Sequence, residues 1–150
     1  MSLELLSVER FDGAELLRRL GETRLRGFEG AQPYRQATLE LAAAFDPELL
    51  APAQRYVLRP GIERILELRT ALLEHDIDVF ALDGGVLVRT SAEPDELIPV
   101  IPPVVEESRE PDGRLVLLIN DGIHRVFAAR SLGLPVSVVL ARGVPAEYPY

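Results

Sequence analysis

Residues 115–133, LVLLINDGIHRVFAARSLG, decide the fold of this chain. The stretch begins with a run of apolar residues from Leu115 to Ile119, as expected of a central strand that is buried on both faces. Asn120-Asp121-Gly122 interrupts this run, and residues 123–131 have the spacing of a short helix that ends before Leu132-Gly133. The pattern therefore predicts a central strand, a tight corner and a helix in direct succession.

Strand signals flank this stretch on both sides. After it, Pro135 prevents the helix from continuing, and residues 136–140 predict another strand. Before it, residues 110–113 have the composition of a turn. Residues 98–105 are apolar and extended, but their prolines confine them to a sheet edge or to an irregular strand.

Residues 56–89 predict a strand, a helix and a hairpin in that order. Tyr56-Val57-Leu58 is the strand, and Pro60 opens an amphipathic helix in which apolar residues recur at helical spacing. Residues 77–82 and 86–89 flank Asp83-Gly84-Gly85, which is a hairpin signal. We therefore expect most of the sheet to form between residues 56 and 142.

The first 52 residues read as helical. Asp12 and Glu15 form a capping box before a helix that stops at Gly21. After a loop over 21–32, Pro33 opens a second helix through Phe45, and Asp46-Pro47 begins a short third one. The expected class is α+β: a small mixed β-sheet flanked by helices in a single domain over 1–150, with a helical N-terminal extension over 1–52 and a core over 56–142.

Composition excludes several kinds of chemistry. The chain of 150 residues has no Cys and only two His, and because it has no Lys, its 16 basic residues are all Arg. Schiff-base and PLP chemistry, a phosphate-loop lysine and thiolate zinc sites are thereby excluded, and neither haem nor flavin is expected. The remaining toolkit of carboxylates, Arg, His, hydroxyls and backbone amides suits the binding or transfer of phosphoryl groups, with or without a metal ion.

Charge and hydropathy limit the expected partners and location. The net charge of −8 and the scattered Arg residues argue against a nucleic-acid partner. No apolar run approaches the roughly 18 residues that span a bilayer, and the N-terminus lacks the features of a signal peptide. We expect a cytoplasmic protein with a small-molecule partner.

The corner at residues 121–125 has the residue types of an anion site. The first amides of a helix lack partners, and the macrodipole leaves roughly half a positive charge there. Gly122 permits close approach of a ligand, Arg125 offers a planar fork for phosphate, and His124 can donate to an anion or move a proton. Asp121 either caps the helix, holds Mg²⁺ against a polyphosphate or acts as a base. The alternative for His124 and Arg125 is a solvated or salt-bridged helix start, but two cations there oppose the dipole unless a ligand is present.

The segment from Asp121 to Ala129, followed by Leu132-Gly133-Leu134 and a Val-rich strand, resembles the signature segment of the ParB/sulfiredoxin fold. In ParB-type domains the glycine opens a G-E-R-R-x-x-A-type motif that contacts nucleotide phosphates, and in sulfiredoxin the equivalent is G-C-H-R. Here the motif reads Gly122-Ile123-His124-Arg125. The resemblance extends from about Tyr56 to Arg142.

This resemblance implies that Gly122, His124 and Arg125 face the phosphates of a nucleoside triphosphate bound with Mg²⁺ or of another phosphorylated ligand, with Asp121 and His124 as catalytic candidates. Ile123 occupies the position of the sulfiredoxin cysteine, so reduction of a sulfinic acid is excluded. No helix-turn-helix region follows, which makes a partition-type DNA clamp improbable. The expectation is a phosphate-ligand domain, either an enzyme of phosphoryl transfer or a catalytically silent regulatory or interaction module.

A few other residues are weaker candidates. Glu106, Glu107 and Glu110 could add a metal ligand or a base to the corner, but a solvated acidic edge is the preferred explanation. Arg59 before Pro60 could be a second phosphate contact. His75 is expected to have a structural role at a helix C-terminus.

Overall fold

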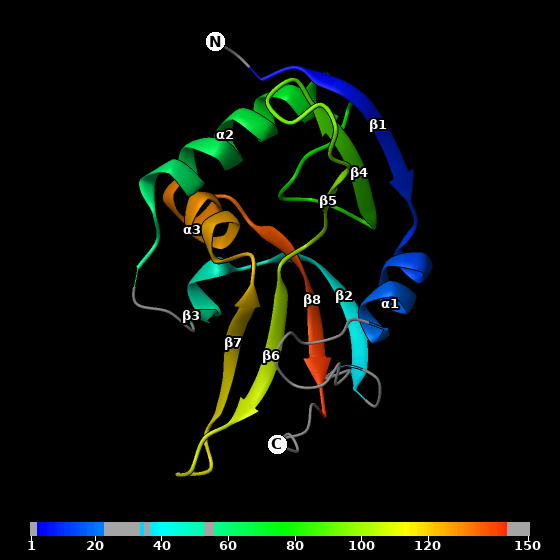
Figure 1. Ribbon diagram of the computed structural model, residues 1–150. Coiled ribbons are helices and arrows are strands. Elements are labelled where there is room, and N and C mark those ends of the chain that lie inside the picture. Colours follow the sequence, from blue (N-terminus) through cyan, green and yellow to red (C-terminus); the bar gives the residue numbers. More distant parts are fainter. Residues whose placement is uncertain (1–2, 23–33, 35–36, 53–55, 144–150) are drawn as a thin grey trace.

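The computed structural model of this protein describes residues 3–22, 34, 37–52 and 56–143. This part of the chain forms two β-sheets and three α-helices, with a short 3-10 helix, which confirms the α+β class (Figure 1). The elements in chain order are β1 (Leu5–Phe11), α1 (Gly13–Gly21), β2 (Thr38–Phe45), η1 (Pro47–Leu49), β3 (Ala51–Pro52), α2 (Arg59–Leu73), β4 (Gly85–Thr90), β5 (Ile98–Val100), β6 (Val104–Arg109), β7 (Leu115–Asp121), α3 (Ile123–Ser131) and β8 (Val136–Arg142).

The larger sheet is mixed, with strand order β2-β8-β6-β7-β3. β8 runs antiparallel to β2 and parallel to β6, and β7 runs antiparallel to β6 and parallel to the short β3. β6 is the middle strand, and residues 136–141 of its neighbour β8 are all buried. The apolar run of β7, which was expected to be buried on both faces, is mostly half-buried, because β7 lies next to the short edge strand β3. The second sheet is antiparallel, with order β1-β4-β5.

Apolar side chains pack on both faces of the larger sheet. Val138 of β8 belongs to the main core, which includes residues of α2, α3 and the second sheet. Val139, its neighbour in the strand, points the opposite way and packs with Leu16 and Leu20 of α1. This alternation is the period of two that a strand imposes. α2 and α3 lie together at one end of the sheet, and α1 lies apart from them (Figure 1).

Several predicted elements are confirmed. Asp12 caps α1, where its carboxylate accepts a hydrogen bond of 2.9 Å from the backbone N–H of Glu15. α2 begins beside Pro60, η1 follows Asp46, and α3 spans the residues that were expected to be helical. Within the described residues, no helix combines the length and the apolar character needed to cross a membrane.

The predicted helix through Phe45 is wrong, because residues 38–45 form strand β2. Leu39 and Leu41 are half-buried while Thr38 and Glu40 are exposed, and this alternation fits a strand paired with β8. Pairing with β8 on both sides of Ala43 and Ala44 outweighs the helix propensity of the alanines. The start of the expected helix at Pro33, like most of the loop over 21–32, lies outside the described residues.

The expected helical N-terminal extension is therefore also wrong. β1, β2 and β3 all lie within the first 52 residues, and they pair with β4, β8 and β7. The N-terminal segment contributes strands to both sheets instead of packing onto a finished core.

Two short strand predictions between residues 56 and 89 are also wrong. Residues 77–82 form a loop with a turn at 79–80, in which the Asp78 carboxylate accepts from the N–H of Phe80. β4 therefore pairs with β1 instead of forming a hairpin with this segment. Tyr56–Leu58 has no strand assignment, although Leu58 is extended with φ −95° and ψ 132°. Ile77, Val79, Phe80 and Leu82 are buried in the core although they lie in a loop. Apolar content alone does not distinguish such a loop from a strand.

The proline-rich stretch at residues 98–105 is irregular, as expected, and it joins the two sheets. β5 is an edge strand of the smaller sheet and β6 an interior strand of the larger one, and Ile101-Pro102-Pro103 crosses between them. The carbonyl of Pro103 accepts a hydrogen bond of 2.8 Å from the N–H of Val139. Pro103 also lies against Gly122, where an added Cβ would come within 2.8 Å of the Pro103 Cβ.

We expect Gly122→Ala to destabilise the fold more than Gly113→Ala does. Both glycines have positive φ, 88° and 89°, but nothing lies within 4 Å of an added Cβ at Gly113. The backbone strain should cost about 1 kcal/mol at Gly113, and the additional clash with Pro103 should bring the loss at Gly122 to about 2–3 kcal/mol. Urea denaturation of the two variants measures the difference. Equal losses would show that Pro103 yields without cost.

Candidate functional site

The corner between β7 and α3 has an unusual helix start. Gly122 is the N-cap residue in the left-handed region, no side chain caps the helix, and its first turn has no acidic residue. The first helical hydrogen bond runs from the N–H of Val126 to the carbonyl of Gly122. The amides of residues 123–125 precede that bond and so have no acceptor within the helix. The expectation that Asp121 caps α3 is therefore wrong. Asp121 is exposed and ends β7.

The start of α2 meets the start of α3 at His124. The N–H of Leu58, the N-cap residue of α2, donates a hydrogen bond of 3.1 Å to Nε2 of His124. α2 also lacks a capping side chain and a first-turn acid. Two positive helix ends therefore converge without a carboxylate in either first turn.

Gly61 makes this approach feasible. A Cβ at residue 61 would lie 2.5 Å from Cδ2 of His124, so the imidazole occupies the space that any other residue would fill. Because Nε2 accepts from Leu58, the neutral ring has its proton on Nδ1. Towards a ligand His124 is then a donor through Nδ1, and Nε2 is not free to serve as a base.

The side chain of Arg125 points into the protein instead of extending into solvent. Its side chain is buried, and Nη1 donates to the carbonyl of Ile101 in the crossing between the sheets. Nε is buried and has no partner, and none of the ion pairs in the described part of the chain includes Arg125. Burial lowers the pKa of the guanidinium to about 10, against the opposing effect of the Asp121 charge. Arg125 is thus a buried cation whose charge is only partly compensated.

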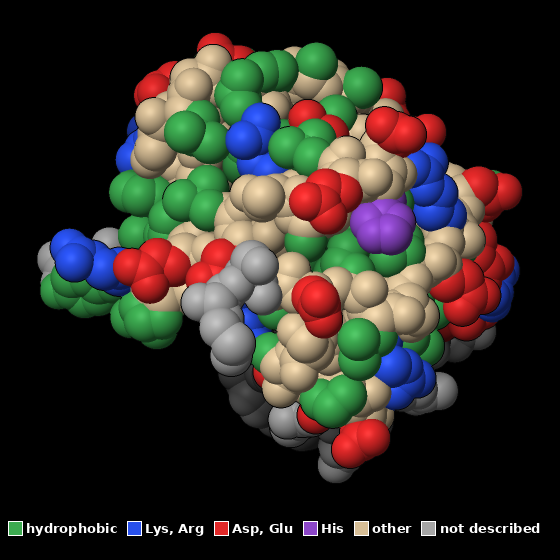
Figure 2. All heavy atoms as spheres, turned by 90° about the horizontal axis from the view of Figure 1, so that it is seen from above, with side chains coloured by type: hydrophobic (Ala, Val, Ile, Leu, Met, Phe, Trp, Pro, Cys, Tyr) green, Lys and Arg blue, Asp and Glu red, His purple; other side chains and the backbone are tan. Residues whose placement is uncertain are grey.

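These groups line one hollow of about 360 Å³. Its lining includes the whole predicted corner over residues 121–125. Ile119 and Asn120 of β7 and Ile65 of α2 complete the lining. Basic side chains are scattered among acidic ones on the face seen in Figure 2, without a continuous basic patch.

Both acidic candidates on β6 already have partners: Glu106 contacts the hollow through its lining residue Asn120, and Glu107 lies in an ion pair. Glu106 accepts a hydrogen bond of 2.7 Å from Asn120, which also donates to the hydroxyl of Tyr34 at 3.3 Å. Burial raises the pKa of Tyr34, and the negative charges of Glu106 and Asp121 raise this pKa further. Glu107 pairs with Arg142 at 2.9 Å. The described residues contain no group of three carboxylates or histidines that could hold a metal ion.

The remaining candidates lie at the ends of elements. Glu110 is in the turn after β6, away from the corner, and Arg59 is the exposed first residue of α2. His75 follows α2, and its carbonyl accepts from Arg10 at 3.3 Å. The sequence did not indicate Leu58 and Gly61 as parts of the site. Their only signal was a glycine directly after Pro60, which alone predicts no contact with a residue more than 60 positions away.

We expect Gly61→Ala to weaken the fold although it removes a helical glycine. Such a change in a free helix position stabilises by about 0.5–1 kcal/mol, and Gly21→Ala, where nothing lies within 4 Å, should show this gain. At position 61 the methyl group displaces the imidazole, so the Leu58 amide should lose its acceptor and exchange faster with deuterium. Urea denaturation and amide exchange test both effects. Unchanged protection at Leu58 would show that His124 does not hold this amide in solution.

Comparison with known proteins gives one match. The family model of the ParB CE domain matches residues 15–150. No curated protein and no solved structure matches the chain. The match covers the second sheet except β1, the whole of the larger sheet and the Gly122–Arg125 corner. The chain therefore belongs to the ParB CE domain family.

Proposed function

We propose that this domain binds a nucleotide or another phosphorylated ligand at the start of α3. In this proposal the amides of residues 123–125 donate to the phosphate oxygens, and Nδ1 of His124 adds a further donor. The observation that supports it most is the combination at one corner of an uncapped helix start and a buried cation, Arg125, without an ion-pair partner.

Electrostatics favours an anion at this place. Natural helices favour Asp or Glu near their N-termini, whereas α2 and α3 both begin without one. Arg125 adds a full charge in a poorly solvated position, where a charge interacts more strongly than it does in water. Nη1 of Arg125 already donates to the carbonyl of Ile101, so the proposal does not require a two-pronged hydrogen bond from this guanidinium to the ligand. Its charge acts from beneath the hollow, and a bound phosphate would raise its pKa again.

The hollow suits a ligand of modest size with a metal counterion. Its volume of about 360 Å³ falls in the lower part of the range for small-molecule sites, roughly 300–1,000 Å³. Asp121 is exposed at its wall, and Mg²⁺ is commonly bound by one or two carboxylates together with substrate phosphates. Asp121 is thus the residue that would place Mg²⁺ on a polyphosphate or act as a base.

Arg125→Met should weaken phosphate binding at least about tenfold, because a buried charge is lost while the side-chain volume is nearly kept. Arg69→Met is the matched control, since Arg69 also has a buried Nε without a partner but lies over the ring of Phe80. Isothermal titration with ATP, CTP, ADP and GTP, with and without Mg²⁺, measures the affinities. Circular dichroism confirms that both variants are folded. Unaltered binding by Arg125→Met would place the ligand elsewhere.

An enzyme and a silent binding module differ in turnover. If the domain transfers phosphoryl groups, labelled nucleotide should yield product, and Asp121→Asn should reduce kcat while nucleotide still binds. Asp112→Asn, in the turn between β6 and β7, is the matched acidic control. Binding without any product in the unmodified protein would support the regulatory alternative.

A further inference from the structure

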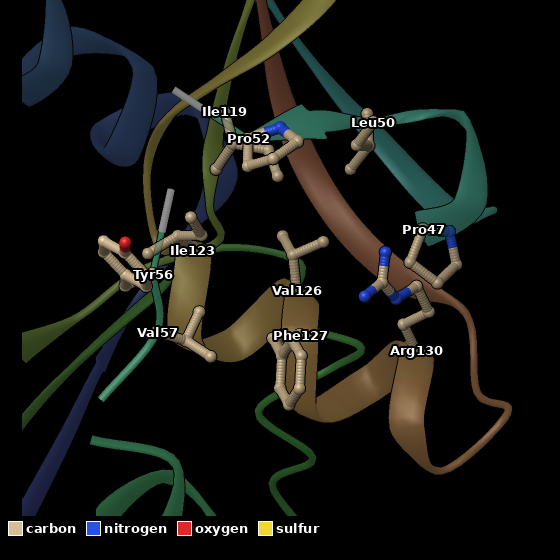
Figure 3. Close-up of a pocket in the computed structure, with 10 residues that line it drawn as sticks. All are labelled: Pro47, Leu50, Pro52, Tyr56, Val57, Ile119, Ile123, Val126, Phe127 and Arg130. Atoms are coloured by element: carbon tan, nitrogen blue, oxygen red, sulfur yellow. The ribbon is translucent and has the colours of Figure 1, made fainter. Parts of the chain in front are cut away.

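A second pocket, of about 150 Å³, lies along α3 (Figure 3). Ile119 and Ile123 line both this pocket and the corner hollow. α3 contributes Ile123, Val126, Phe127 and Arg130, which share one face of the helix at spacings of three, four and seven. The opposite wall comes from η1, β3 and the segment before α2, and we call the whole the α3 pocket.

The lining of the α3 pocket is almost entirely apolar. Eight of its ten residues are proline, aliphatic or phenylalanine, and only Tyr56 and Arg130 have polar side-chain atoms. A nucleobase placed here would leave several of its donors and acceptors without partners, at a cost of a few kcal/mol. The α3 pocket is therefore poorly suited to bind the nucleobase of the ligand proposed at the corner. Its volume suits one apolar group of about the size of benzene, such as a Leu or Phe side chain.

Exposed apolar side chains adjoin this pocket. Tyr56 lines it and is 74% exposed, Leu58 follows the lining residue Val57 and is 64% exposed, and Leu49 precedes the lining residue Leu50 and is 63% exposed. Exposed apolar patches around a pocket are typical of protein–protein interaction sites, and Tyr and Arg are among the residues that contribute most binding energy there. The surroundings thus favour a protein partner over a small molecule.

The charge at the pocket specifies the partner further. Arg130 is its only charged lining residue, its guanidinium lies 5.5 Å from the centre of the Phe127 ring, and Figure 3 shows it extending towards Pro47 across the pocket edge. A cation in the last turn suits the helix dipole, but that does not account for its placement over an apolar pocket. In a chain of net charge −8, this exposed cation beside apolar residues is complementary to a carboxylate.

We propose that the α3 pocket is a docking site for a segment of a partner protein that inserts a Leu- or Phe-sized side chain and places an adjacent Asp or Glu against Arg130. The apolar side chain supplies affinity by displacing water from the pocket, and the carboxylate supplies selectivity. This site shares Ile119 and Ile123 with the phosphate site, but the proposal does not depend on phosphate binding.

Three capped tripeptides test the proposal by NMR on the ¹⁵N-labelled chain: acetyl-Glu-Leu-Glu-amide, acetyl-Lys-Leu-Lys-amide and acetyl-Glu-Ser-Glu-amide. The first should shift the amides of residues 126–130 and 56–57 in a saturable way. The second lacks the carboxylates and the third lacks the apolar side chain, so both should bind more weakly. Equal shifts with all three peptides, or shifts confined to another surface, would overturn the proposal.

Single substitutions separate the two contacts. Arg130→Gln should weaken binding of the Glu-Leu-Glu peptide about two- to fivefold and should not weaken binding of the Lys-Leu-Lys peptide, because a charge that repels the lysines is lost. Arg109→Gln, at an exposed arginine on β6, should change neither. Tyr56→Ala, at a side chain exposed enough to spare the fold, should reduce binding of both leucine peptides. Arg125→Met should leave peptide binding intact, which distinguishes this site from the phosphate site. If instead the chain dimerises in sedimentation and Tyr56→Ala abolishes the dimer, a second copy occupies the pocket and the hetero-partner proposal fails.

Discussion

The close approach of Gly122 to Pro103 is the constraint on which the rest of the structure depends. The left-handed backbone at Gly122 lets β7 turn directly into α3 while the prolyl ring lies where a side chain would otherwise be. The same crossing segment is held from other directions, because the carbonyl of Pro103 accepts from the N–H of Val139 in β8 and that of Ile101 accepts from Arg125. The link between the two sheets and the start of α3 are therefore one packed unit.

This arrangement holds the side chains of the candidate site from several directions. Arg125 is anchored by a backbone carbonyl instead of a carboxylate, so its position is fixed while much of its charge remains uncompensated. His124 is held between the start of α2 and the space left by Gly61. Fixed donors and charges of this kind lower the reorganisation that binding requires, at the expense of stability in the empty state. The fold thus places a buried charge and two uncapped helix starts at the same corner.

The sequence was most informative where local chemistry and tertiary structure agree. The capping residues Asp12 and Glu15, the apolar run of β7 and the proline that follows α3 each predict an element that the structure contains. The predictions are wrong where the secondary structure of a segment depends on the strand with which it pairs. Ala42–Ala44 favours a helix in isolation, but Ala42 and Phe45 pair with β8, and Ala43 and Ala44 lie in an irregularity of the strand between them, where Ala44 has φ 53°. Residues 77–82 have strand-like composition, yet the Asp78 carboxylate supports a turn, and β1 takes the place beside β4.

The sequence by itself determined the corner: an apolar strand, a glycine that permits positive φ, and a helix with His124 and Arg125 in its first turn and no acid to offset them. These properties depend on residues close together in the chain, where spacing and composition suffice. Only the tertiary structure decided how those side chains are used, because their partners are distant in sequence. Leu58 supplies the donor that assigns the tautomer of His124, and the crossing at Ile101 turns Arg125 inward and buries it. Contacts of this kind form only after both sheets and α2 have packed together, so no local pattern encodes them.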